Sequence, residues 1–301
     1  MNLSKTQKAI LALIIANTIW GAASPIFKWS LEGIHPFTLA FLRFGIAAIF
    51  LLPFVYRDLK VEKKDFMKIF LMAFFGITIN ITFFFFALKD TVSINAPIIG
   101  SSAPVFIIFF SILFLKEHPR TKTLIGGLIG LLGVLVIIVV PIIKMGFTMS
   151  TLGNLFLILA TFGSIGHLLI AKKICDKYDP LKIVFYSFII GALTFTPLFL
   201  GEVKTFGLLS QINLHGIIGI VFGAVFSSAV AFSFYHWSIK YLPASEVGIF
   251  IYLDPIIAVA IAIPLLGEIP TPTYLIGSLL VFLGIYIAEG RIHYHPFHRL
   301  K

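Results

Sequence analysis

The chain has 301 residues, of which 59% are hydrophobic and only 12% are charged, and its mean hydropathy is +1.04. Soluble domains contain about 45–50% apolar and about 25% charged residues, so this composition excludes a soluble globular protein and predicts an integral membrane protein. The net charge of +10 does not change this interpretation, and we expect no nucleic acid as a partner. The single cysteine, Cys175, excludes a disulfide within the chain.

Apolar runs long enough to cross a bilayer core of about 30 Å as helices occur ten times along the chain. The sequence therefore predicts an all-α integral membrane protein with ten transmembrane helices, for which the lipid bilayer is the solvent. The predicted spans lie at residues 7–27, 36–56, 66–88, 92–115, 124–143, 151–171, 182–200, 215–238, 243–266 and 274–289.

Lysine and arginine residues are concentrated in every second segment between these spans. The two ends of the chain and every second loop hold 18 of the 23 basic residues, the other loops hold four, and Arg43 lies inside the second span. Cytoplasmic loops retain Lys and Arg. The distribution therefore predicts a multi-pass protein of the cell membrane with both termini in the cytoplasm.

The second half of the chain repeats the first. A shift of 151 residues brings Glu117 onto Glu268, and nearer the start a shift of 144 residues brings Pro36 onto Pro180. Each half then holds five helices, and an odd number per half means that the halves lie inverted in the membrane. Inverted repeats with a site at their interface are the architecture of many secondary transporters. The alternative is that the repeat only records gene duplication.

The repeat also defines the expected domain organisation. We expect the first repeat, with spans one to five, at residues 1–143, and the second repeat, with spans six to ten, at residues 151–290. Residues 291–301 are then a cytoplasmic tail.

Several stretches resemble one known family over essentially the whole chain. They are "NTIWGAASPIF" in span one, "FTLAFLRFGIAA" in span two, "APVFIIFFSILFLKEHP" in span four and "DPIIAVAIAIPLLGEIPTPTYLIGSLLVFLGIYI" in spans nine and ten. The chain resembles the EamA family of the drug/metabolite transporter superfamily. That family usually has Glu-Pro where this chain has Asp254-Pro255. The resemblance implies transport of a small metabolite, often efflux, and does not identify the substrate.

One face of the first span carries polar residues at helical spacing: Asn17, Trp20, Gly21 and Ser24. A polar stripe inside a bilayer faces protein or a water-filled cavity rather than lipid, so we expect Asn17, Trp20 and Ser24 to bind substrate. The alternative is that Gly21 and Ser24 permit close helix packing while Asn17 bonds across helices.

Other spans contribute further polar residues to a cavity between the two halves. For His167 the alternative is a structural role, which most buried histidines have. For Tyr235 the alternative is a role as an anchor at the membrane interface. The remaining candidates for substrate binding are Asn80, Ser102, Thr161, His167, Ser227 and Tyr235.

Asp254 lies near the middle of the ninth span, where a carboxylate is costly. It can couple proton movement to transport if its charge changes with access to water, or it can stay ionised and contact a cationic group of the substrate. In a third interpretation a protonated Asp254 bonds carbonyls that Pro255 has freed. Pro255 and its counterpart Pro104 are the expected hinges, because proline interrupts the hydrogen bonds of a helix.

Three further features have competing interpretations. For Arg43 we favour snorkelling to the outer surface over pairing with a carboxylate or binding an anionic substrate. Glu117 and Glu268 are expected to fix helix ends through hydrogen bonds. Stripes of small residues pack either within the chain or between two copies in a homodimer, and they consist of Gly126, Gly130, Gly133, Gly277, Gly284 and Ala288.

The sequence contains no Walker loop, no HExxH motif and no catalytic triad pattern, so we expect neither a cofactor, a metal site nor an enzyme. The sequence predicts a secondary transporter that exports a small metabolite, such as an amino acid or a related compound, by alternating access, with proton coupling as one option. The alternative is a passive channel or facilitator for small solutes.

Overall fold

The computed structural model describes residues 4–103, 106, 121–175, 177–207, 212–242 and 250–289. Every regular element in these ranges is a helix. The chain divides into two compact units, which do not coincide with the two sequence repeats. The larger unit combines Met1–Gly100 with Met149–Ile269, and the smaller unit combines Ser101–Thr148 with Pro270–Lys301.

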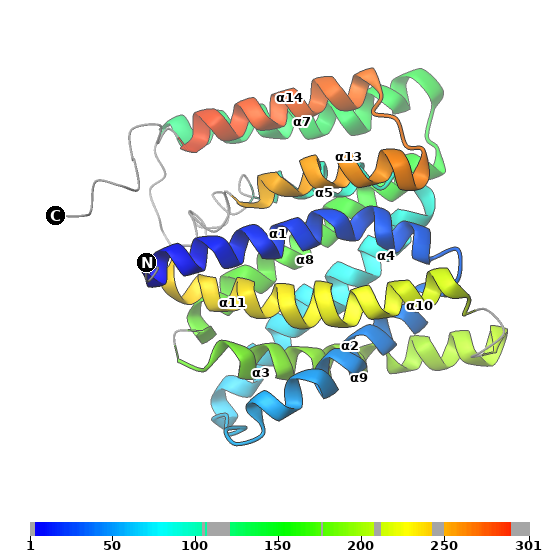
Figure 1. Cartoon of the computed structure of the whole chain (residues 1–301). Helices are drawn as coiled ribbons and strands as arrows, with labels where there is room; N and C mark the ends of the chain where they lie inside the picture. The colour runs from blue at the N-terminus through cyan, green and yellow to red at the C-terminus, as the bar shows by residue number, and fades with distance from the viewer. Residues whose placement is uncertain are drawn as a thin grey trace. The chain divides into compact units, whose positions relative to one another are not determined.

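The larger unit contains most of the helices (Figure 1). Its N-terminal part consists of α1 (Lys5–Ser30), α2 (Pro36–Val55), α3 (Lys63–Ala73), the π-helix η1 (Phe74–Ile79), α4 (Asn80–Asp90) and α5 (Asn95–Gly100). Its C-terminal part consists of α8 (Met149–Cys175), α9 (Pro180–Phe206), α10 (Leu214–Val221), the π-helix η2 (Phe222–Val230), α11 (Ala231–Tyr241), the 3₁₀-helix η3 (Phe250–Tyr252) and α13 (Leu253–Leu266).

Seven helices of the described residues are long and apolar enough to cross a membrane, which confirms a multi-span membrane protein. They include two continuous helices, Lys63–Asp90 and Leu214–Tyr241, which join α3 to α4 and α10 to α11 through the π-helices. These seven correspond to predicted spans one to three and five to eight. The ninth and tenth predicted spans correspond to shorter apolar helices, Leu253–Leu266 and Pro272–Gly284.

The fourth predicted span, 92–115, lies largely outside the described residues. Its described part is interrupted, because α5 ends at Gly100 and Ser101 and Ser102 form a turn before helix resumes at Ala103.

Helix bounds recur at the offsets found in the sequence. Lys63–Asp90 and Leu214–Tyr241 begin 151 residues apart and end 151 residues apart. The π-helices Phe74–Ile79 and Phe222–Val230 also end 151 residues apart. Nearer the N-termini of the two sequence repeats, α1 and α8 begin 144 residues apart, and so do α2 and α9. The repeated sequence therefore begins corresponding helices at matching positions in both parts of the chain.

Local capping explains several of these bounds. α2 begins at Pro36 and α9 at Pro180, each at the first helical position, where the missing N–H of proline costs no helix bond. The first turn of α2 also lies against the carboxylate of Glu202, which accepts hydrogen bonds from the backbone N–H groups of Phe37 and Thr38 at 3.2 and 2.7 Å. An anion at a helix N-terminus satisfies donors that have no partner inside the helix.

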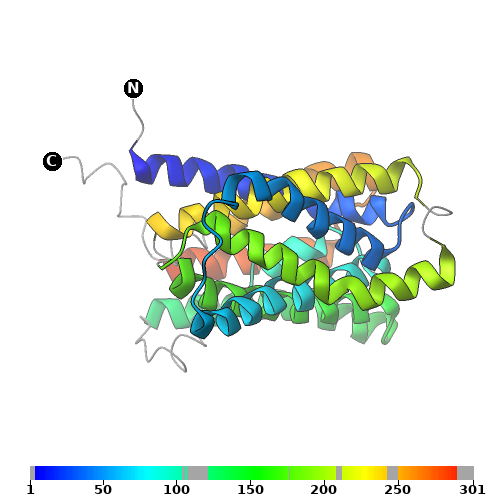
Figure 2. The ribbon, with the colours of Figure 1, turned by 90° about the horizontal axis from the view of Figure 1, so that it is seen from below.

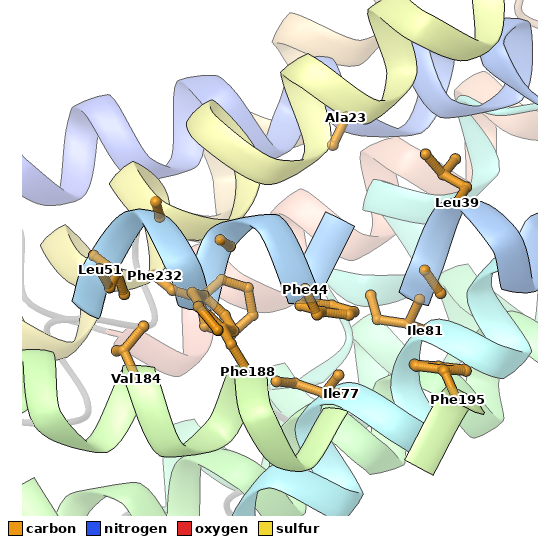
Figure 3. Packing of buried hydrophobic residues seen from close by; sticks show 14 of the residues in the cluster. Ala23, Leu39, Phe44, Leu51, Ile77, Ile81, Val184, Phe188, Phe195 and Phe232 are labelled. Carbon is orange, nitrogen blue, oxygen red and sulfur yellow. The ribbon is translucent and has the colours of Figure 1, made fainter. Parts of the chain in front are cut away.

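The core of the larger unit is built mainly from apolar residues of α2, α9 and α4, with contributions from α1, η1 and α11 (Figure 3). Phe44 of α2 packs against Phe188 and Phe195 of α9, with ring centroids 5.6 and 6.3 Å apart. Phe232 of α11 contacts Phe188 edge-on at 5.5 Å. α2 and α9 lie side by side, as Figures 1 and 2 both show.

In the smaller unit, α7 (Thr121–Met145) packs along α14 (Pro272–Glu289). A Cβ atom on Gly284 would lie 2.4 Å from the backbone of Gly126 and Gly130, and one on Gly133 would lie 2.5 Å from the carbonyl oxygen of Gly277. The predicted stripes of small residues therefore let these two helices approach within one chain. Ala288 belongs to α14, but its side chain lies outside the described part of the structure.

Candidate functional site

The polar face of α1 packs against α13 and α11. At its centre is Gly21, where a Cβ atom would lie 2.9 Å from both the Cα and the carbonyl oxygen of Asp254 and 2.8 Å from the Cβ of Ile257. α1 thus meets the first turn of α13 backbone to backbone, which only a glycine permits. Asn17 and Ser24 lie one turn to either side of Gly21 on this face of α1.

Three buried polar atoms around this contact have no hydrogen-bond partner among the described residues. They are Oδ1 of Asn17, Oγ of Ser24 and Oδ1 of Asp254. Asn17 uses its amide N–H to donate to the carbonyl of Leu13 at 2.8 Å, which leaves its oxygen unpaired. Each unsatisfied buried polar group costs about 1–3 kcal/mol, so three of them near one helix contact need an explanation beyond helix packing.

Pro255 lies in the first turn of α13, directly after Asp254. Backbone N–H groups in the first turn have no partner inside the helix, so Pro255 removes no hydrogen bond of α13. The irregular backbone is the 3₁₀ turn Phe250–Tyr252, just before it. The role of Pro255 as a hinge stays a prediction, and Pro104 lies outside the described residues.

Trp20 connects α1 to the π-helix η2. Its indole N–H donates to the carbonyl oxygen of Ser227 at 3.0 Å. Its ring contacts those of Phe232 and Tyr235 edge-on, with centroids 5.2 and 5.0 Å apart. Tyr235 is buried in this aromatic group rather than placed at an exposed surface.

Arg43 is buried in the middle of α2, with only 2% of its surface exposed, so the expectation that it snorkels to the surface is wrong. Its Nε donates to Oγ of Ser228 at 2.7 Å and its Nη2 donates to Oγ of Ser227 at 3.1 Å. The guanidinium also lies 4.7 Å from the ring centroids of both Phe27 and Phe44. No carboxylate among the described residues lies within ion-pair distance of it.

The π-helix η2 therefore supplies partners to two spans at once: Ser227 to both Trp20 and Arg43, and Ser228 to Arg43. A π-helix is rare, and one inside an α-helix is frequently found at a functional site. The sequence predicted a role for Ser227 but could not show that Arg43 reaches it.

His167 of α8 faces a second histidine, His236 of α11. Their Nε2 atoms are 3.1 Å apart, and both side chains are buried. Nδ1 of His167 lies 3.0 Å from the carbonyl oxygen of Met72, and Nδ1 of His236 lies 2.8 Å from that of Phe232. Sequence reasoning missed His236, because it stands in a stretch typical of the membrane interface.

Two other predicted residues already have partners in the protein. The side-chain N–H of Asn80 donates to the carbonyl of Ala160 at 2.7 Å, and the hydroxyl of Thr161 donates to the carbonyl of Leu157 at 2.8 Å. Ser102 is buried and belongs to the smaller unit. No group of three metal-ligating side chains was found in the described part of the chain.

Comparisons with known proteins agree with this helical architecture. Residues 7–139 and 151–289 each match the EamA-like transporter family. A transporter of Archaeoglobus fulgidus that is called uncharacterized is 26% identical over 93% of this chain and 98% of its own length. The uncharacterized transporter YdfC of Bacillus subtilis is 28% identical over 93% of this chain and 90% of its own length.

One solved crystal structure shares the fold, with a TM-score of 0.68 at 17% identity, over 95% of this chain and 99% of that one. The double family match covers nearly all of the ten predicted spans and includes α1, η2 and α13, which form the candidate site. The chain belongs to the EamA-like transporter family.

Proposed function

We propose that this protein is a secondary transporter that exports a small metabolite across the cell membrane by alternating access. The observation that carries the proposal is a group of buried polar atoms at the contact between α1 and α13 that have no partner among the described residues: Oδ1 of Asn17, Oγ of Ser24 and Oδ1 of Asp254. Polar side chains that only joined two helices in lipid would bond each other or nearby backbone, whereas these three atoms have no partner among the described residues.

The backbone near this site supports the same proposal. α13 starts directly after a 3₁₀ turn, and the corresponding part of the first repeat is interrupted at Ser101 and Ser102. Secondary transporters typically bind substrate where two such discontinuous helices meet the repeat interface. We therefore propose ten spans in two inverted halves of five, with both termini in the cytoplasm, as the matching helix starts and the distribution of Lys and Arg favour.

Asp254 is the proposed coupling residue. A carboxyl group that takes up a proton on one side of the membrane and releases it on the other can drive the substrate against its gradient. A pH difference of one unit supplies about 1.4 kcal/mol per proton, which corresponds to about tenfold accumulation when one proton moves per substrate. Such a ratio is sufficient to export a metabolite that is in surplus.

The test first identifies a substrate by comparing the metabolite sensitivity of cells that overproduce the protein with that of control cells. Purified protein in liposomes is then given an imposed pH gradient, and uptake of the labelled substrate is followed. Wild-type protein should accumulate it above equilibrium, whereas a passive channel only equilibrates it.

Asp254→Asn should abolish this accumulation while exchange of substrate across the liposome membrane continues. The matched control is Glu32→Gln, which neutralises a carboxylate that is 60% exposed and should leave accumulation unchanged. Accumulation by Asp254→Asn under the same gradient would exclude Asp254 as the coupling residue. Equilibration without accumulation by the wild-type protein would contradict proton-driven transport.

A further inference from the structure

We propose that His167 and His236 form a proton-binding site in which one proton is shared between their Nε2 atoms. The hydrogen-bond donors of the two rings require this proton whether or not the protein is a transporter. The two rings come from α8 and α11, and each is fixed at its other nitrogen by a backbone carbonyl. They meet nearly perpendicular, at 84° between ring planes.

The two carbonyls determine where the first two protons lie. A carbonyl oxygen only accepts hydrogen bonds, so the nitrogen that faces it must carry hydrogen. Nδ1 of His167 faces the oxygen of Met72 at 3.0 Å, and Nδ1 of His236 faces the oxygen of Phe232 at 2.8 Å. A neutral imidazole has one N–H, and both rings have now used theirs.

Two lone pairs are then left facing each other across the Nε2–Nε2 contact. At 3.1 Å this distance is that of an N–H···N hydrogen bond, and two bare lone pairs at this distance repel. One additional proton between the rings removes the repulsion and gives every ring nitrogen a partner. If one ring instead took the other tautomer, its Nδ1 lone pair would face a carbonyl oxygen.

With the shared proton, the pair of rings carries one positive charge. The aromatic rings of Phe232 and Tyr235 lie beside this charge, and the centroid of Phe232 is 6.1 Å from that of His167 and 5.9 Å from that of His236. Tyr235 contacts His236 edge-on at 5.7 Å. Aromatic faces stabilise a cation without neutralising it. The site therefore holds its proton through three hydrogen bonds and contacts with aromatic rings rather than through an ion pair.

No carboxylate of the described residues lies within ion-pair distance of either ring. From α11 the phenol of Tyr235 is adjacent, and from α8 the thiol of Cys175 is buried two turns beyond His167. Asp65 of α3 is paired with Lys68 and Lys177.

The charged and polar groups on α9, α1 and α13 have other partners or other positions. From α9, Lys182 pairs with Asp58, and Tyr186 donates to the carbonyl of Leu59. α1 presents the neutral Trp20, and the carboxyl group of Asp254 lies on α13.

The geometry also ties three helices together through this proton. His167 joins α8 to the end of α3 at Met72, and its ring fills the space beside Gly76 of η1, where a Cβ atom would lie 2.2 Å from Nδ1. The shared proton extends this connection to α11. Loss of the proton turns the contact between the α8 and α11 rings from attractive to repulsive.

The test is nuclear magnetic resonance of the full-length protein in lipid nanodiscs, with ¹⁵N incorporated in its histidines. Among the eight histidines, the proposed pair should show three protonated ring nitrogens and one proton coupled to two nitrogens across the hydrogen bond. Two protonated nitrogens in total would overturn the proposal, with or without such a coupling, because a neutral pair with one ring in the other tautomer also forms an N–H···N hydrogen bond. This measurement needs no substitution and no substrate.

Two variants assign the signals. His167→Gln and His236→Gln should each abolish the coupling across the hydrogen bond, and either one suffices if the other does not fold. His215→Gln is the control, because His215 stacks on Trp29, and the coupling should persist in that variant. A coupling that survives substitution of His167 or of His236 would overturn the assignment.

Zinc is the alternative occupant, because two imidazoles with fixed Nδ1–H groups also resemble part of a metal site. Spectra are therefore compared after treatment with a chelator and after addition of Zn²⁺. Under the proposal, the chelator leaves the shared-proton signal unchanged. If that signal is absent until a chelator removes metal, the site is a metal site and the proposal is wrong.

Discussion

Lys28 and Glu268 form an ion pair, with 2.9 Å between Nζ and Oε1, although 240 residues separate them in the chain. The Glu268 carboxylate also accepts hydrogen bonds from the backbone N–H and the hydroxyl of Ser93, at 2.9 and 2.8 Å, and from the N–H of Ile94 at 3.3 Å. Nζ of Lys28 donates in addition to the carbonyl of Thr91 at 2.6 Å. Glu268 therefore holds the start of α5 beside the ends of α1 and α13, as a residue that fixes helix ends should.

Lys28→Met should destabilise the protein, because it leaves the carboxylate of Glu268 buried without its counter-charge. Removing one partner of a buried pair costs about 3–5 kcal/mol, and since 28% of the Lys28 side chain is exposed we expect about 1–3 kcal/mol. The measurement is thermal unfolding in detergent. The control is Lys64→Met, which breaks the exposed pair with Glu62 and should change the melting temperature little.

Gly21→Ala should destabilise the contact between α1 and α13. The new methyl group would lie 2.9 Å from backbone atoms of Asp254, which cannot move aside as a flexible side chain does. Overpacking of this kind costs about 1–3 kcal/mol. Gly45→Ala in α2 is the matched control, because nothing lies within 4 Å of its Cβ position, and alanine should stabilise the helix there by about 1 kcal/mol. Equal melting temperatures for the two variants would contradict the close approach.

The sequence predicted the long helices because their signal is local. Pro36 and Pro180 begin helices where proline is favoured, and long apolar runs follow them. The offset of 151 residues, read from matched residues such as Glu117 and Glu268, recurs in the bounds of Lys63–Asp90 and Leu214–Tyr241. Hydropathy did not separate the π-helices from their flanking α-helices, because both keep the same apolar residues in lipid.

The contacts of the candidate site could be predicted only in part. Asn17, Gly21 and Ser24 were placed on one face of α1 by helical spacing alone. The sequence could not show that Gly21 meets Asp254, because that contact depends on how α13 is positioned. The partners of Arg43 were missed for a related reason: a buried arginine without a carboxylate is costly, and nothing in the apolar stretch around it indicates the two serine hydroxyls that hold it.

Stability should depend on pH through Asp58, which lies outside the predicted spans. A hydrogen bond from Lys182, with 2.6 Å between Nζ and Oδ2, holds the pKa of the Asp58 carboxyl below its ordinary value of 3.8. Because the pKa is lower in the folded protein than in the unfolded chain, this contribution to stability is present above pH 3.8 and is lost as the pH falls through the folded value.

Asp58→Asn should therefore lower the melting temperature at neutral pH, and the difference from wild type should shrink once the pH falls well below 3.8. Lys182→Met removes the same interaction, so combining it with Asp58→Asn should lower the melting temperature by less than the sum of the two single effects. A constant difference between Asp58→Asn and wild type across this pH range would show that the effect does not arise from ionisation of Asp58.

Arg43→Lys should be poorly tolerated although it keeps the positive charge. Arg43 donates from Nε to Ser228 and from Nη2 to Ser227, two atoms that the planar guanidinium holds at a fixed separation. A single ammonium group on a flexible chain does not reproduce this fork. A hydrogen bond to a charged group contributes about 1.5–3 kcal/mol, so we expect Arg43→Lys to lower the free energy of unfolding by at least about 1.5 kcal/mol. Thermal unfolding measures this change.

Ser228→Ala separates the role of the fork from that of the charge. It removes the hydroxyl that accepts from Nε of Arg43 at 2.7 Å. In the Arg43→Lys background Ser228→Ala should lower the free energy of unfolding by less than it does in the wild-type protein, because the fork is already lost. Arg57→Lys is the control, since the one side-chain hydrogen bond of Arg57 among the described residues goes to the exposed hydroxyl of its neighbour Tyr56. If Arg43→Lys unfolds at the wild-type temperature, the two hydrogen bonds from the guanidinium to the serines do not contribute to stability. If Arg43→Met is also as stable as wild type and exports substrate normally, the buried charge serves neither packing nor transport, and the part of the candidate site around η2 must be abandoned.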